Sequence, residues 1–223
     1  MMNVISFQFN FCIFFSISTF LHCLDFVGHR FLYQILSILE EGYNVDSIYL
    51  DFAKAFDKVD IGILCQKLRN LGISGKLGVL IFNFLSGREQ IILANGNKSS
   101  TSIVKSGVPQ GTVLGPILFL ILINDIDQDI NSDSFVSLFA DDTRIAKKIK
   151  DESDVESLQE DLEKLYKWQE ENNMQFNSKK FKILRYGRNQ TLKDSTHYLT
   201  ANHEEIIEEK ESLQDLWQRR NEE

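Results

Sequence analysis

Apolar and polar residues repeat with two different periods along the chain, and these periods predict where helices and strands lie. Apolar residues three or four positions apart predict helices, and strict alternation predicts strands with one buried face. We therefore expect helices at residues 31–42, 61–71, 76–85, 116–123 and 153–172. We expect strands at residues 45–52, 90–94, 101–105, 174–176 and 181–186, and a hairpin over 135–146. This mixture predicts one α+β domain.

Turn and capping residues support several of these boundaries. Asn95-Gly96 is a strong hairpin signal between the strands at 90–94 and 101–105. Ser153 and Glu156 have the spacing of a capping box, which predicts that the long helix begins there.

The two ends of the chain differ from the middle. The first 24 residues carry no charge and are rich in Phe, but they lack the basic start of a secretory signal and the unbroken apolar run of a spanning helix. We expect residues 1–30 to be an apolar segment outside the domain, with a decayed or artefactual start favoured over a membrane role. Residues 204–223 hold eight acidic and three basic groups, which predicts a solvated or frayed helix.

Composition sets limits on the class of protein. A hydrophobic content of 43% with 25% charged residues is typical of a globular domain. The three cysteines show no pairing or zinc-type spacing, so we expect a reducing compartment, the nucleus or cytoplasm, and no secretion. The net charge is −8, and most of it lies in residues 151–223. This acidity disfavours binding to nucleic acid, whose affinity for proteins comes largely from Lys and Arg.

Asp141-Asp142 interrupts the predicted hairpin where its turn belongs. Two carboxylates about 4 Å apart repel by roughly 4 kcal/mol at an effective dielectric constant near 20, so a divalent cation is a natural compensation. An isolated Asp-Asp pair is more often an ordinary turn. Other segments of the chain change that interpretation.

Four segments occur in a fixed order. They are Leu50-Asp51-Phe52-Ala53-Lys54-Ala55-Phe56-Asp57, Ser106-Gly107-Val108-Pro109-Gln110-Gly111, Phe139-Ala140-Asp141-Asp142 and Asn177-Ser178-Lys179-Lys180. Each is ambiguous alone. In this order and spacing they closely resemble the palm of a reverse transcriptase, best of the non-LTR retrotransposon type. The resemblance covers about residues 31–190. It implies an antiparallel, ferredoxin- or RRM-like palm sheet with helices packed on one face.

The resemblance implies an RNA-directed DNA polymerase that adds dNTPs to a DNA primer on an RNA template. Two Mg²⁺ ions, with Mn²⁺ as a possible substitute, would act in nucleotidyl transfer; such ions lie about 3.5–4 Å apart. By the family pattern Asp51 and Asp141 are the essential metal ligands and catalytic residues, the carbonyl of Phe52 is a further ligand, and Asp142 is supporting.

The family pattern also implies a nucleotide site. Phe56 corresponds to the bulky gate that excludes a ribose 2′-hydroxyl, against the plainer interpretation of a core aromatic. Gln110 and Gly111 resemble the loop that packs on the incoming nucleotide. Lys180 corresponds to the proton donor for pyrophosphate, although Lys179 beside it leaves the register open by one residue. Arg88 receives only a general nucleic-acid role.

The chain also departs from the family pattern. The basic fingers segment expected before residue 31 is replaced by the Phe-rich run, and residues 191–223 form an acidic tail with a degraded entry to the thumb. Three alternatives therefore stay open: a truncated remnant that folds without polymerising, a domesticated binding module, and an RNA-dependent RNA polymerase, which Phe56 disfavours.

Overall fold

The computed structural model describes residues 17–139, 142–187 and 198–209. Its first element is the helix α2 (Ile17–Glu40), followed by the strand β1 (Asn44–Asp51). The helix predicted from residue 31 is confirmed, but it begins at Ile17, inside the segment expected to lie outside the domain. The sequence did not predict a helix over residues 17–30 because the alternation of apolar and polar positions is weak there.

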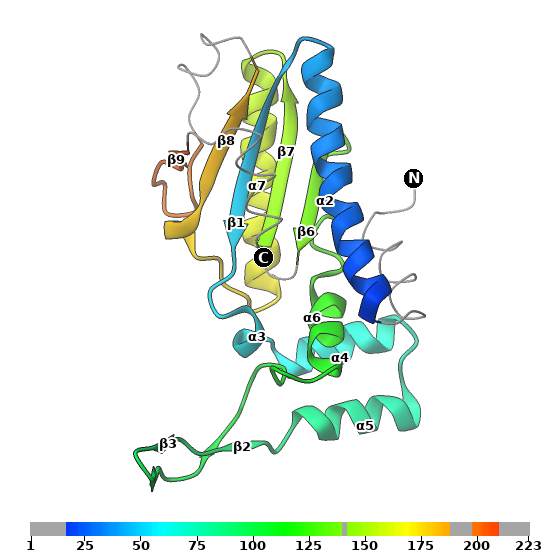
Figure 1. Cartoon of the computed structure of the whole chain (residues 1–223), viewed down its shortest axis with the longest axis vertical. Helices are drawn as coiled ribbons and strands as arrows, with labels where there is room; N and C mark the ends of the chain where they lie inside the picture. The colour runs from blue at the N-terminus through cyan, green and yellow to red at the C-terminus, as the bar shows by residue number, and fades with distance from the viewer. Residues whose placement is uncertain (1–16, 140–141, 188–197, 210–223) are drawn as a thin grey trace.

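A five-stranded sheet forms the centre of the molecule (Figure 1). Its strands are ordered β6-β7-β1-β8-β9. The bounds are Ser134–Phe139 for β6, Asp142–Ile149 for β7, Lys182–Tyr186 for β8 and Ile207–Glu208 for β9. All neighbours are antiparallel except β8 and β9, which run parallel. The predicted hairpin and the strands of residues 45–52 and 181–186 are therefore confirmed.

One face of the sheet packs against the helix α7 (Glu152–Glu171). Ile48, Ile145 and Ile183 are completely buried there, together with Leu158 and Leu162 of the helix. The Cα register pairs Ile48 with both Ile145 and Ile183, so the three side chains form one row across the sheet.

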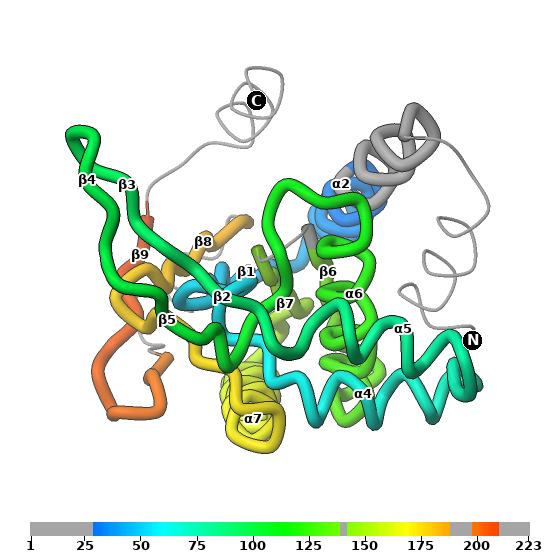
Figure 2. Tube along the Cα trace, turned by 90° about the horizontal axis from the view of Figure 1, so that it is seen from below, coloured from blue at the N-terminus to red at the C-terminus, as the bar shows by residue number. Residues whose placement is uncertain are grey.

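The opposite face is covered in part by α2, as Figure 2 shows. Phe31 and Ile35 of this helix pack on Val45, Ala146 and Leu184, which alternate with the residues of the α7 face. The prediction that helices pack on one face is therefore wrong. Apolar side chains at this end of the sheet point to both faces, so both faces need a cover.

Four helices lie at the end of the sheet where β1 stops. They are α3 (Ala55–Lys58), α4 (Ile61–Asn70), α5 (Gly75–Leu85) and α6 (Leu114–Ile123). Asp60 caps α4 by accepting a hydrogen bond of 3.0 Å from the Ile63 amide. Most side chains of α6 are buried, as its continuous apolar sequence predicts. The predicted helices at 61–71 and 76–85 are confirmed, and α6 begins two residues before Pro116.

A slender ribbon extends from α5 (Figure 1). Its strands are β2 (Glu89–Gln90), β3 (Leu93–Ala94), β4 (Asn97–Lys98) and β5 (Ser102–Ile103). Asn95 and Gly96 both have positive φ, 49° and 80°, as the predicted tight turn requires.

Three local predictions are corrected. The cap of α7 is Asp151, which accepts a hydrogen bond from the Ser153 amide, so the helix begins before the predicted capping box. Residues 174–176 form only an isolated bridge between Phe176 and Phe52. The described part of the acidic tail contains β9, not a helix, because Tyr198 and Ile206 are buried in the main core and bring the segment to the sheet edge.

None of the described helices has both the length and the apolar character needed to cross a membrane.

A buried lysine ties the β6–β7 hairpin to α7. Lys147 on β7 is completely buried, and its Nζ lies 2.6 Å from Asp133 Oδ2 and 3.1 Å from Ser157 Oγ. Asp133 itself is 65% exposed. The Lys147 ammonium is therefore buried, whereas the Asp133 carboxylate that pairs with it still contacts water.

We predict that Asp133→Asn lowers the free energy of unfolding at pH 7 by about 1–3 kcal/mol, because the buried ammonium loses its carboxylate. The measurement is urea unfolding, and the control is the same substitution in a Lys147→Met background, where the loss should be smaller. An equal loss in both backgrounds would contradict this explanation.

The same pair predicts a dependence on pH. The hydrogen bond from Lys147 lowers the pKa of Asp133. Such a carboxyl group stabilises the fold above its unfolded pKa and loses this contribution as pH falls through its lower folded pKa. The stability difference between the wild type and Asp133→Asn should therefore shrink below about pH 4.

Candidate active site

The candidate site begins with two carboxylates on neighbouring strands. Asp51 is the last residue of β1 and Asp142 is the first residue of β7, and the antiparallel register pairs them directly. Side chains that are paired across strands share a face of the sheet, so these two carboxylates project on the same side. The side chain of Asp51 is 17% exposed, and Asp142 is exposed.

Asp141, the second predicted ligand, lies outside the described residues. In the sequence it falls between Phe139 and Asp142, which are paired across the β6–β7 hairpin. Within the described ranges no three His, Cys, Asp or Glu side chains are grouped to hold a metal ion.

Lys180 faces the Asp51 carboxylate. Its Nζ lies 2.5 Å from Asp51 Oδ2, and 64% of its side chain is exposed. It lies in the short 3₁₀ helix η1 (Ser178–Lys180). The residues just before η1 are hydrogen-bonded to the end of β1. The Asn177 amide donates to the Asp51 carbonyl and the Ala53 amide to the Gln175 carbonyl, each at 2.7 Å.

Positive charge also lies on the strands beside the carboxylates. Arg144 is paired in register with Tyr49, and its guanidinium carbon lies 4.8 Å from the centre of the Tyr49 ring. This pair is two residues from Asp51 and Asp142 and therefore on the same face. Lys180 is therefore the cation paired with a carboxylate of this site, and Arg144 lies over Tyr49 on the same face.

Phe52, the residue after Asp51, has its side chain in the core. Its side chain is 3% exposed and stacks on Phe176 with ring centres 4.4 Å apart. The hydrogen bonds of the Phe52–Phe176 bridge join the residues on either side of the pair, so this bridge does not use the Phe52 carbonyl. The carbonyl is the part of Phe52 that the sequence implicates as a ligand.

Phe56 lies on α3, one short turn beyond β1. Its ring stacks on Phe119 of α6 with centres 4.8 Å apart, and it is half-buried. The ring is therefore held in place by the core while part of it remains exposed. The stacking on Phe119 is what a core aromatic makes, and the gate stays a prediction.

The loop of residues 106–111 packs on the turn that carries Phe56. The Val108 amide donates to the Phe56 carbonyl and the Gly107 amide to the Val59 carbonyl, each at 2.8 Å. Gly107 has φ of 86°, and a Cβ there would lie 2.8 Å from the Phe56 carbonyl oxygen. Only glycine fits so close to another backbone.

Gln110 and Gly111 stand at the exposed end of this loop. Gln110 Nε2 lies 3.4 Å from Asp57 Oδ1, a contact that sequence reasoning missed, and Gly111 has φ of 74°. Sequence reasoning also assigned Arg88 only to nucleic acid, whereas its guanidinium donates to the carbonyls of Leu85, Ser106 and Gly107. Neither contact has a signal in the sequence, because each joins residues brought together by the fold.

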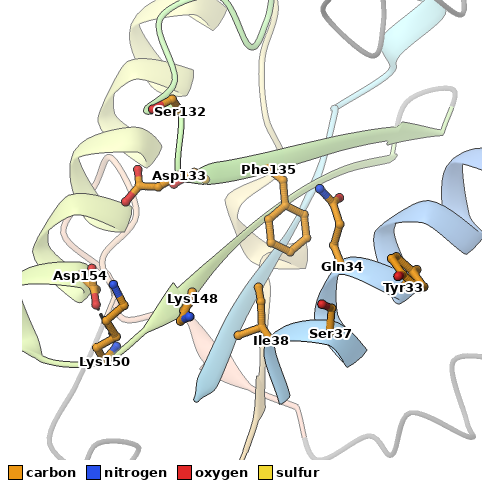
Figure 3. A pocket seen from close by; sticks show the side chains of 11 residues that line it. Tyr33, Gln34, Ser37, Ile38, Ser132, Asp133, Phe135, Lys148, Lys150 and Asp154 are labelled. Atoms are coloured by element: carbon orange, nitrogen blue, oxygen red, sulfur yellow. Dashed lines mark hydrogen bonds between the residues drawn. The ribbon is translucent and has the colours of Figure 1, made fainter. Parts of the chain in front are cut away.

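A pocket lies at the other end of the sheet (Figure 3). It has a volume of about 360 Å³ and lies between α2, β6, the end of β7 and the start of α7. Three of its charged side chains have partners within the protein: Lys148 pairs with Glu41 at 2.5 Å, Asp133 pairs with Lys147, and Asp154 accepts from the Lys150 backbone amide. Lys148 is six residues along β7 from Asp142, about 20 Å in a strand. This pocket is therefore separate from the carboxylate pair.

The carboxylate pair fits a divalent metal of the magnesium type. Mg²⁺ takes oxygen ligands and keeps several waters, so it needs only a few carboxylates. Asp51 Oδ2 is buried, and its partner among the described residues is the Lys180 ammonium. A buried oxygen of this kind, opposite a second carboxylate, is suited to a cation.

Curated relatives come from mobile elements. The RNA-directed DNA polymerase from mobile element jockey of Drosophila funebris is 32% identical over 161 residues, which are 68% of this chain and 17% of that protein. The probable RNA-directed DNA polymerase from transposon X-element of Drosophila melanogaster is 30% identical over 164 residues, 71% of this chain and 18% of that protein. The chain therefore spans about a sixth of the length of these relatives.

Solved telomerase structures share the fold. The apo telomerase of Candida tropicalis, truncated from the C-terminal domain, superimposes with a TM-score of 0.55 at 13% identity. The match covers 81% of this chain and 43% of that chain. A family model described as reverse transcriptase (RNA-dependent DNA polymerase) matches residues 32–205. The chain belongs to the reverse transcriptase (RNA-dependent DNA polymerase) family.

Proposed function

We propose that residues 31–190 form the palm, with part of the fingers, of an RNA-directed DNA polymerase. The reaction joins the 3′ oxygen of a DNA primer to the α-phosphorus of a dNTP and releases pyrophosphate. One observation carries the proposal: Asp51 and Asp142 are paired across two central strands, with Lys180 against Asp51. Membership of the family supplies the chemistry that this arrangement suits.

The carboxylates of Asp51, Asp141 and Asp142 and the Phe52 carbonyl would hold two Mg²⁺ ions, for which Mn²⁺ could substitute. The ions would supply charge stabilisation for the attacking 3′ oxygen and the leaving pyrophosphate. The sheet fixes Asp51 and Asp142, because each ends or begins a strand whose neighbouring residues are buried. Rigid carboxylates of this kind reduce the reorganisation needed during reaction.

The nucleotide would lie between the carboxylates and the loop of residues 106–111. Gln110 and Gly111 would pack against it, and the exposed part of the Phe56 ring would exclude a ribose 2′-hydroxyl. Lys180 would donate a proton to the leaving pyrophosphate. Because Lys180 and not Lys179 makes the ion pair with Asp51, we assign this role to Lys180.

Local charge supports contact with an RNA template and a DNA primer. The acidic excess lies in residues 151–223, whereas residues 61–105 contain six basic residues and one acidic residue. Lys67 pairs with Asp125 and Arg88 bonds to backbone carbonyls, so the exposed basic residues left for this contact are Arg69, Lys76, Lys98 and Lys105. Phosphate contacts require such local positive charge, not a positive total.

Primer extension on an RNA template with Mg²⁺ tests the proposal. We predict that Asp51→Asn slows extension by about 10³-fold, because the metal site contributes several kcal/mol of charge stabilisation. The matched control is Asp129→Asn, an exposed carboxylate after α6, which should extend normally. If the wild type folds but extends no primer, the truncated remnant or the binding module is favoured.

The two neighbouring lysines provide a matched pair. We predict that Lys180→Gln lowers the rate of single-nucleotide incorporation by about 10²-fold, in the range of general acid catalysis. Lys179→Gln should stay within about twofold of the wild type, since Lys179 is exposed and makes no ion pair with the described residues. Rapid-quench kinetics at saturating dNTP measures both. Equal effects of the two substitutions would contradict the assignment.

The gate predicts a change in sugar selectivity. Phe56→Ala should lower the preference for dNTP over the matching rNTP by about 10-fold or more, because the steric exclusion of the hydroxyl is lost. The ratio of the two kcat/KM values is independent of the fraction of folded enzyme. Phe82→Ala, which removes an exposed aromatic ring on α5, is the control. An unchanged ratio in Phe56→Ala would show that the ring serves the core alone.

A further inference from the structure

Arg88 joins the end of α5 to the loop of residues 106–111. Its Nε donates to the Leu85 carbonyl at 2.8 Å. Its Nη2 donates to the Ser106 carbonyl at 3.1 Å and also to the Gly107 carbonyl. The guanidinium therefore joins the end of α5 to a loop 18 and 19 residues after Arg88 itself, through three backbone oxygens.

The other side of the same loop is fixed to the α3 turn. The Gly107 and Val108 amides donate to Val59 and Phe56, and Ser106 Oγ donates to the Asp57 carbonyl at 2.8 Å. The amides of residues 107–108 thus bond to the α3 turn, while the carbonyls of residues 106–107 bond to Arg88. The loop is held from both sides just before Gln110 and Gly111.

We infer that Arg88 is a positioning residue for the nucleotide-binding loop. This inference rests on the proposed function, since the loop matters for activity only if it packs on the incoming nucleotide. Arg88 holds the carbonyls of residues 106–107 in place. In this way it also determines where Gln110 lies relative to Asp57 and Phe56. Its role is therefore different from the nucleic-acid contact that its charge suggested.

The planar fork of the guanidinium is what this position requires. Arginine presents several N–H donors in fixed directions, so one side chain can serve acceptors on two segments at once. A lysine ammonium carries the same charge, but it is a compact donor on a flexible stem and lacks this fixed geometry. Arg88→Lys therefore separates the bridging role from a purely electrostatic one.

A simpler role for Arg88 is capping α5. The bond from Nε to Leu85 satisfies one of the free carbonyls at the end of this helix, as basic residues often do. This role would stabilise residues 82–86 and leave the loop unaffected. The two roles can be told apart by which backbone amides exchange faster when Arg88 is substituted.

Amide hydrogen exchange on the full chain tests the bridge without requiring activity. Arg88→Ala and Arg88→Lys should both raise the exchange rates of the Gly107 and Val108 amides by about tenfold, because the loop opens locally. The Ala53 amide, which bonds to Gln175 away from this loop, should be unchanged and reports intact folding. Lys105→Ala, which removes an exposed charge just before the loop, should leave all three rates unchanged.

Steady-state primer extension tests the consequence for the nucleotide site. Both Arg88 variants should raise the KM for dNTP by about tenfold, the effect of losing roughly 1.4 kcal/mol of positioning, and leave the KM for primer–template unchanged. A purely structural defect would lower the active fraction and kcat, without changing the KM for dNTP.

Each outcome decides between the roles. Faster exchange of the loop amides with a raised KM for dNTP in both variants supports the inference. Normal behaviour of Arg88→Lys, or a raised KM for primer–template, shows a charge contact with nucleic acid and overturns it. Faster exchange confined to residues 82–86 shows a helix cap and also overturns it. If the wild type synthesises no DNA, the proposed function fails, and the exchange experiment alone decides whether Arg88 holds the loop.

Discussion

The register between β1 and β7 is the constraint on which the candidate site depends. Side chains alternate between the two faces of a sheet, so a shift of one residue would send Asp51 and Asp142 to opposite faces. The alternation is enforced along the strands, where Ile48 packs toward α7 and Val45 packs toward α2. A shifted strand would place buried side chains in the wrong core. The apolar packing far from the site therefore determines where the carboxylates meet.

Charge balance is the second property of the site. Two carboxylates on one face would repel, and the fold places the Lys180 ammonium against Asp51. Lys180 is paired with a carboxylate oxygen of Asp51, which under the proposed function would also bind a metal ion. A metal ion would therefore bind in competition with a cation already present, and its binding would leave Lys180 available for a phosphate oxygen. Lys180 thus balances the charge of Asp51 in the fold and is also the proton donor in the proposed reaction.

The loop of residues 106–111 is held mainly through its backbone groups. Amides on one side bond to the α3 turn, carbonyls on the other bond to Arg88, and Gly107 permits the close approach. The residues that would meet a nucleotide, Gln110 and Gly111, are exposed beyond these contacts. Their placement is thus determined by backbone bonds to the α3 turn and by Arg88.

The sequence by itself determined the elements with regular periods, the hairpin at Asn95-Gly96 and the order of the segments that carry the carboxylates. These features are local, because periodicity and turn residues record which side of a short segment is buried. The tertiary structure alone decided that α2 covers the second face, that Lys180 and not Lys179 meets Asp51, and that Arg88 bonds to the loop. Each of these depends on segments distant in sequence, and a distant partner leaves no pattern in the residues around either member of the pair.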